Sequence, residues 1–162
     1  MAVLKRIFSG FEMLNKKLVP AIALVLAANV AWGAPSTERG KYIVSIAGCN
    51  DCHTDGYAET GGQVPMEDWL LGSSFGWSGP WGTTYATNLR LSAPNKSEDE
   101  WIAYAKHLQA KPPMPWFSLH HMTDEDLRSV YRFIRSLGAD GEAAPDALPP
   151  GQEPKGSHAV FP

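Results

Sequence analysis

The sequence predicts a small all-α domain in which three to five helices are joined by long loops. Three segments carry apolar residues at helical spacing, and each is bounded by residues typical of helix ends. Residues 55–95 are instead rich in Gly, Ser, Thr, Pro and aromatic residues without a helical period, so we expect loops there. The length of 162 residues leaves room for one such domain.

The N-terminus is predicted to be a secretory signal peptide covering residues 1–33. An almost uninterrupted apolar run at 18–31 follows four basic residues, Lys5, Arg6, Lys16 and Lys17. The small residues Ala31 and Gly33 favour cleavage after Gly33. An uncleaved membrane anchor is the weaker alternative, because the run is shorter than the ~20 residues that span a bilayer. We therefore expect a periplasmic protein with a domain at 34–140 and a proline-rich extension at 141–162.

The first helix is predicted over residues 35–47. Ser36 or Thr37 can cap its N-terminus, and Gly48 ends it. Its apolar stripe is predicted to consist of Tyr42, Ile43 and Ile46.

Two further helices are predicted in the second half of the chain. Ser97 and Glu100 form a capping box for a helix that runs to about residue 108, with Trp101, Tyr104 and Leu108 on one face. A weaker box of Thr123 and Asp126 opens a helix that Gly138 ends, whose apolar face holds Leu127, Val130, Tyr131, Ile134 and Leu137. The tail at 139–162 holds five prolines and is expected to be an extended wrap or a disordered arm.

The strongest motif is Cys-Asn-Asp-Cys-His at 49–53, which contains both cysteines of the chain. The C-x-x-C-H spacing is the attachment signature of c-type haem. Cys49 and Cys52 can both reach the vinyl groups of one porphyrin, while the imidazole of His53 lies under the iron. The motif therefore predicts one covalently bound haem c.

Three other interpretations of this motif fit less well. A thioredoxin-like redox pair needs a strand and helix context that is not seen around Cys49. A structural zinc site needs four ligands, and no further Cys or His pair has zinc-finger spacing. A plain disulfide leaves the role of His53 unexplained.

The second axial position of the iron decides between an electron carrier and a ligand-binding site. Met114 is the preferred candidate, because the prolines of Pro112 to Pro115 restrict the backbone around it and reduce the entropy lost on ligation. Met122 is the nearest rival, although its place before Thr123 also suits a hydrophobic staple. Weaker candidates are Met66, His107, His120 and His121.

The charge of the chain bears on its partners. Without residues 1–33, ten Lys and Arg face sixteen Asp and Glu, which gives a net charge of −6 before any haem propionates are counted. Nucleic acid is therefore not an expected partner. The acidity fits docking on a basic patch of a redox partner, and it equally fits a role in solubility alone.

Several segments of the chain resemble class I cytochromes c. The matching segments are Gly40 to Tyr42, the motif at 49–53, Met114 to Trp116, Met122 to Leu127, and Tyr131 to Leu137. They most resemble the cytochrome c domains of periplasmic membrane-bound dehydrogenase subunits, in which a run like Trp81 to Leu89 also occurs. The resemblance implies thioether bonds at Cys49 and Cys52, His53 as proximal ligand and Met114 as distal ligand. It also implies crossed terminal helices in which Gly40 packs against Tyr131.

Two features depart from that resemblance. Those subunits usually carry several haem domains and a C-terminal membrane anchor, whereas this chain has one haem motif and no C-terminal apolar run. Their Asn-Leu or Asn-Ile is followed by Thr-Pro-Asp, but here Asn88 and Leu89 lead to Arg90, Leu91 and Ser92. The role of this loop is therefore open at the level of sequence.

The expected function is single-electron transfer between a donor dehydrogenase and an acceptor such as a terminal oxidase. The chain would then be an electron carrier, or an electron-transfer subunit of a dehydrogenase complex, and not an enzyme. Trp81, Tyr85 and Asn88 are the expected contacts of the haem propionates. The alternatives are a haem-based sensor or ligand-binding protein with an open sixth position, and a peroxidase that uses His120 or His121 as acid and base.

Overall fold

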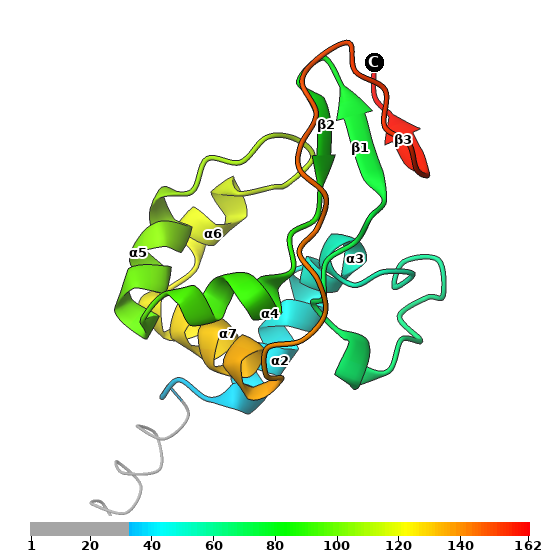
Figure 1. Cartoon of the computed structure of the whole chain (residues 1–162). Coiled ribbons are helices and arrows are strands. Elements are labelled where there is room, and N and C mark those ends of the chain that lie inside the picture. Colours follow the sequence, from blue (N-terminus) through cyan, green and yellow to red (C-terminus); the bar gives the residue numbers. More distant parts are fainter. Residues whose placement is uncertain (1–32) are drawn as a thin grey trace, which may run out of the picture. The chain divides into compact units, whose positions relative to one another are not determined.

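The computed structural model describes residues 33–162, so the predicted signal peptide, apart from its last residue, lies outside the described part. The described residues form six α-helices and a short sheet, which confirms a mostly helical fold (Figure 1). Within residues 33–162, no helix is both long enough and apolar enough to cross a membrane.

Helices α2 (Thr37–Ile46) and α7 (Asp124–Ser136) pack against each other, although 77 residues separate them in the chain. The Ser36 hydroxyl caps α2 by accepting a hydrogen bond from Arg39 N at 3.1 Å. At the crossing, a Cβ on Gly40 would overlap the carbonyl oxygen of Ser129 and lie 2.7 Å from Phe133 Cβ. The crossing itself is as expected, but the predicted partner Tyr131 is wrong, because Gly40 faces Ser129 and Phe133.

The buried face of α2 also differs from the prediction. Ile43 and Val44 are buried, whereas Tyr42 and Ile46 are 60% and 64% exposed. Ile43 and Val44 lie three and four positions after Gly40 and therefore on the same side of the helix, whereas Tyr42 and Ile46 do not. The predicted stripe was thus displaced by part of a turn.

Helices α3 (Cys49–His53), α5 (Glu98–His107) and α6 (Phe117–His121) complete the helical part together with α4 (Leu89–Ser92). The capping box of α5 is present, since Ser97 N donates to Glu100 Oε2 at 2.8 Å and Glu100 N donates to Ser97 Oγ at 3.3 Å. Thr123 caps α7 through a bond from Asp126 N at 3.1 Å. Both predicted helices are therefore confirmed.

The segment predicted as loops contains a β-hairpin. Strands β1 (Gly76–Gly79) and β2 (Gly82–Tyr85) pair antiparallel, and β3 (His158–Val160) pairs parallel with β1, giving the order β2-β1-β3. Short 3₁₀ turns lie at Met66–Asp68 and Ala93–Asn95. The expectation of loops over 55–95 is wrong for the hairpin and for helix α4, which both lie in this range. The tail supplies a third strand that steadies the short hairpin.

The tail is an ordered, extended segment that runs along the hairpin (Figure 1). Leu148 and Thr83 exchange backbone hydrogen bonds at 3.0 and 2.9 Å, and Phe161 N donates to Ser78 O at 2.8 Å. Gly82, with φ +96°, leaves room for this path, since a Cβ there would overlap Leu148 O. Of the two predictions for the tail, the extended wrap is the one confirmed.

Candidate haem-binding site

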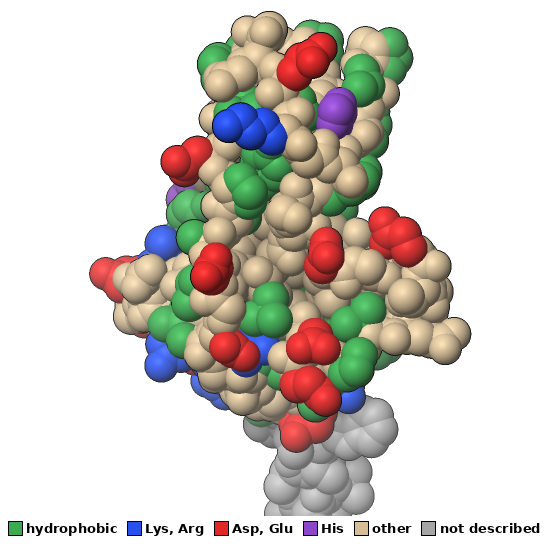
Figure 2. Space-filling model, turned by 45° about the vertical axis from the view of Figure 1, so that its right-hand side comes forward, with side chains coloured by type: hydrophobic (Ala, Val, Ile, Leu, Met, Phe, Trp, Pro, Cys, Tyr) green, Lys and Arg blue, Asp and Glu red, His purple; other side chains and the backbone are tan. Residues whose placement is uncertain are grey.

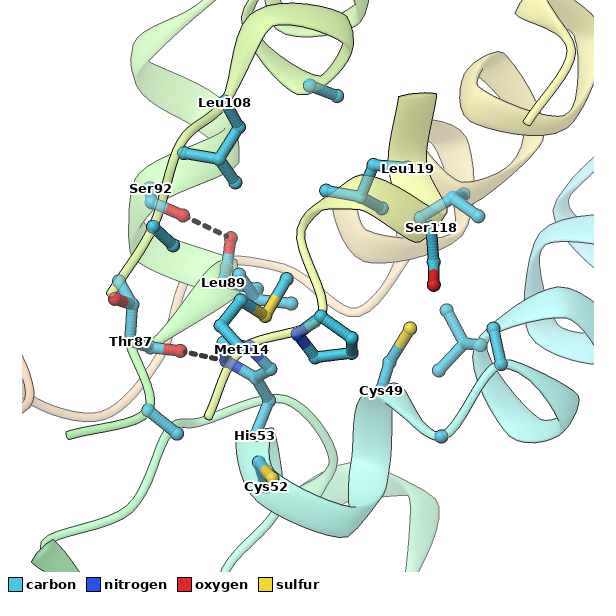
Figure 3. A pocket seen from close by; sticks show the side chains of 18 of the residues that line it. Cys49, Cys52, His53, Thr87, Leu89, Ser92, Leu108, Met114, Ser118 and Leu119 are labelled. Carbon is cyan, nitrogen blue, oxygen red and sulfur yellow. Dashed lines mark hydrogen bonds between the residues drawn. The ribbon is translucent and has the colours of Figure 1, made fainter. Parts of the chain in front are cut away.

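One cavity of about 310 Å³ lies between the helices and the hairpin, and its lining is mostly apolar (Figure 3). Residues of α2, α3, α5 and α7 contribute to its wall, together with the loop before α6. The face of α5 predicted from its spacing, Trp101, Tyr104 and Leu108, lines this cavity. Cys49, Cys52, His53 and Met114 line it as well.

His53 enters the cavity from the last position of α3. Its Nδ1 lies 2.7 Å from the carbonyl oxygen of Thr87, which can only accept, so Nδ1 carries the proton and donates. The lone pair of Nε2 is then free to bind a metal. Burial lowers the pKa of His53, and the hydrogen bond to Thr87 opposes this shift. The neutral, ligating form of the imidazole is therefore favoured.

The turn that carries His53 is held by backbone contacts with the next loop. Gly72 N donates to His53 O at 2.8 Å, and Leu70 N donates to Thr54 Oγ1 at 2.8 Å. Leu70 is fully buried with φ +63°, a conformation that costs energy outside glycine. These contacts fix the backbone at His53 and Thr54.

The two cysteines both belong to α3 and line the cavity. Burial, with a smaller contribution from the charge of Asp51, raises the pKa of Cys49 to about 11. The pKa of Cys52 is raised for the same two reasons. Neither thiol is set up as a thiolate nucleophile or metal ligand, whereas an uncharged thioether has no charge to desolvate.

Met114 points into the cavity from the loop between α5 and α6 (Figure 3). This loop is tied to the hairpin, because Thr84 Oγ1 donates to Pro112 O at 2.8 Å. Trp116 N donates to Met114 O at 2.9 Å and closes the turn on its other side. The proline-rich loop thus presents the thioether from a fixed backbone.

The structure separates the other candidates for the distal position. Met122 lines the same cavity, so it remains a rival by position. Met66 is 41% exposed and lies outside the lining. His107, His120 and His121 also lie outside it, and His120 Nε2 is within 3.0 Å of Leu108 O.

Of the three residues expected at the propionates, Tyr85 and Asn88 both line a second cavity beside the first, whereas Trp81 lines neither. Tyr85 also lines the first cavity. Trp81 lies outside the lining, where its indole packs against Phe161 at a centroid distance of 5.8 Å. Asn88 donates both amide hydrogens to the tail, to Asp140 O at 2.9 Å and Glu142 O at 3.1 Å, and has none left for a propionate.

Sequence reasoning missed the acceptor of His53 and the role of Arg90. The acceptor is the backbone carbonyl of Thr87, and a backbone carbonyl leaves no signal in residue type. Arg90 is buried and donates to the carbonyls of Glu67, Leu137 and Gly138 at 2.6 to 2.7 Å. For Arg90 the sequence contained a signal, because this arginine stands where the resembling subunits have the threonine of Thr-Pro-Asp.

The residues present fit a haem. A mostly apolar cavity suits the macrocycle, two thiols stand on one turn, and a neutral imidazole and a thioether sulfur line the same space. Crossed terminal helices around such a cavity define a small c-type haem protein. The profile of the Cytochrome c family matches residues 37–138, and the chain belongs to this family.

Two curated proteins are similar in sequence to part of this chain. The chain is 31% identical over 110 residues to the fructose dehydrogenase cytochrome subunit of Gluconobacter japonicus, and the match covers 62% of this chain and 21% of that protein. It is 26% identical over 130 residues to a nicotinate dehydrogenase subunit of Pseudomonas putida, and this match covers 71% of this chain and 10% of that protein. No solved structure matches the chain. Membership of the family and these relatives support a role in electron transfer.

Proposed function

We propose that this chain is a monohaem electron carrier, with thioether bonds at Cys49 and Cys52 and with His53 and Met114 as axial ligands. The observation that carries the proposal is that His53 and Met114 line one apolar cavity beside both thiols. The partner is proposed to be a dehydrogenase, because both relatives are named as dehydrogenase subunits. We further propose that the protein lies in the periplasm and passes its electrons to an acceptor such as a terminal oxidase.

The protein's own residues prepare the site for electron transfer. When bound, the haem supplies a one-electron couple between ferrous and ferric iron. The Thr87 carbonyl holds the imidazole of His53 in one tautomer and one orientation. The hydrogen bond from Thr84 to Pro112 would hold the loop that carries Met114, so that neither ligand would need to move when the iron changes oxidation state. Apolar side chains of the cavity exclude water, which favours the less charged ferrous state.

The test is the visible spectrum of the ferric protein, purified from a host that attaches haem c. The proposal expects the weak methionine-to-iron charge-transfer band, and it expects Met114→Ala to abolish this band. Met66→Ala is the matched control, because Met66 lies outside the cavity. Loss of the band in Met122→Ala instead would transfer the ligand role to Met122. A high-spin spectrum in the unchanged protein would contradict the electron-carrier function and favour a sensor.

A further inference from the structure

A second cavity of about 480 Å³ adjoins the first. The two cavities share part of their walls, namely Thr84, Tyr85, Thr87, Ser92 and Lys111. The outer wall of the second cavity is residues 143–147 of the tail, which lie beyond the part that the family profile matches.

The chemistry of haem makes the junction of the two cavities important. A haem carries two carboxylates on one edge of an apolar ring, and carboxylates are not buried in apolar surroundings without a partner. The first cavity offers an apolar lining for the ring. The second cavity offers polar side chains, of which Tyr85, Ser92 and Lys111 also border the first.

We propose that the second cavity holds the propionate edge of the haem, with Lys111 as its cationic partner and the tail as its outer wall. This inference rests on the proposed function. Lys111 lies at the junction, and its Nζ is 3.5 Å from Trp81 O. The basic residue Lys96 borders the first cavity only, and its Nζ lies 4.8 Å from the centroid of the Tyr104 ring.

The tail is attached on both sides of its wall segment. Before the wall, Asn88 binds the carbonyls of Asp140 and Glu142. After it, Leu148 pairs with Thr83. Residues 143–147 are thus held across the cavity by contacts that do not involve the haem, and the wall carries one acidic side chain, Asp146.

Zero-length cross-linking tests the place of Lys111. A carbodiimide activates a carboxylate, and a neighbouring lysine amine then forms an amide with net loss of one water. The carboxylate of Asp146 could also be linked to Lys111, so the experiment is carried out in the Asp146→Asn variant. We expect the haem-bearing peptide of 49–53 to become linked to the peptide of Lys111, as mass spectrometry would show. The link should be lost in Lys111→Gln and kept in Lys96→Gln.

Amine labelling tests the wall. With carbodiimide and an added small amine, a chain ending at Glu142 should label its haem carboxylates faster than the full chain. A chain ending at Glu153 keeps the wall and the pairing of Leu148 with Thr83, and should label like the full chain. Unchanged visible spectra would show that both shortened chains keep the haem site.

The outcomes separate this inference from the proposed function. A protein without the spectrum of haem c overturns both. A normal spectrum with a link to Lys96, or with no link to Lys111, overturns the place of the propionates and leaves the electron-carrier function intact. Equal labelling of all three chain lengths overturns the role of the tail as wall.

Discussion

At the scale of single residues, Gly40 shows how one missing side chain sets the contact between α2 and α7. A Cβ at this position would overlap the Ser129 carbonyl, which is backbone and cannot turn aside. We expect Gly40→Ala to lower the free energy of unfolding by about 1–3 kcal/mol, the usual cost of overpacking. Urea unfolding followed by fluorescence would measure it.

The matched control for this substitution is Gly156→Ala. The nearest atom to a Cβ at Gly156 is Ser74 O at 3.9 Å, so its effect should stay within about 0.5 kcal/mol. Equal stabilities of the two variants would contradict the close approach of α2 and α7 at Gly40.

Arg90 is the second residue whose replacement should be costly. Its side chain is 6% exposed, and its donors meet three backbone carbonyls, including those of Leu137 and Gly138 at the end of α7. Arg90→Met leaves these acceptors without a donor, and we expect it to cost about 2–4 kcal/mol in the free energy of unfolding. Arg90→Lys should cost nearly as much, because an ammonium cannot reproduce the planar fork. A wild-type midpoint in urea for both variants would contradict this role.

The part of the site that was predictable from sequence has a simple physical basis. The motif at 49–53 is local, so spacing alone brings Cys49, Cys52 and His53 together. Two other hydrogen bonds join segments far apart in the chain, namely that from His53 to the Thr87 carbonyl and that from Asn88 to the tail. Such bonds leave no pattern in the local sequence. Apolar spacing located Trp101 and Leu108 correctly, because a helix face repeats regularly.

At the scale of elements, α5 and α7 are joined by ion pairs centred on Glu98. Its carboxylate accepts hydrogen bonds from Arg132 and from Arg128, which hold the pKa of Glu98 below its usual value of 4.5. Glu98 therefore binds a proton more weakly in the folded than in the unfolded state. Its contribution to stability is complete above pH 4.5 and is lost as the pH falls through the lower folded pKa.

The corresponding prediction concerns the pH dependence of Glu98→Gln. Near neutral pH the variant should be less stable than the unchanged protein, by about 0.5–1 kcal/mol because the pairs are close to the surface. The difference should shrink as the pH falls below 4.5. Thermal unfolding at a series of pH values would measure it, with Glu153→Gln on the exposed tail as the control of equal charge. A difference independent of pH would contradict the assignment.

The elements also show why the hairpin was not predicted. Strands β1 and β2 have four residues each, and three of those eight are glycines, so no alternation of apolar and polar residues develops. Their third partner, β3, comes from the end of the chain. The helices were predictable because caps and apolar spacing are local, whereas this sheet depends on pairing across more than 70 residues.

At the scale of the whole molecule, acidic side chains are spread over the surface instead of gathered in one patch on the face that Figure 2 shows. Most of the described ion pairs join α7 to α2 or to α5, and one joins Arg90 of α4 to Asp140 of the tail. This distribution gives no single charged face in that view. A fall in the rate of electron transfer from a dehydrogenase to this protein with rising salt would favour docking by charge.

The largest consequence for the whole molecule concerns folding without the haem. The haem would cover the mostly apolar lining of a cavity of about 310 Å³ between the helices and the hairpin, and without the haem this lining would be exposed to water, which is unfavourable. The total stability of a domain of this size is about 5–15 kcal/mol. A chain that cannot hold the haem should therefore lose its fixed packing. We expect Cys49→Ser with Cys52→Ser to keep part of its far-ultraviolet helical signal while losing the near-ultraviolet signal of its tryptophans. Met66→Ala, which leaves the cavity unchanged, should keep both signals, and a sharp thermal transition in the double variant would show that the helices pack without the haem.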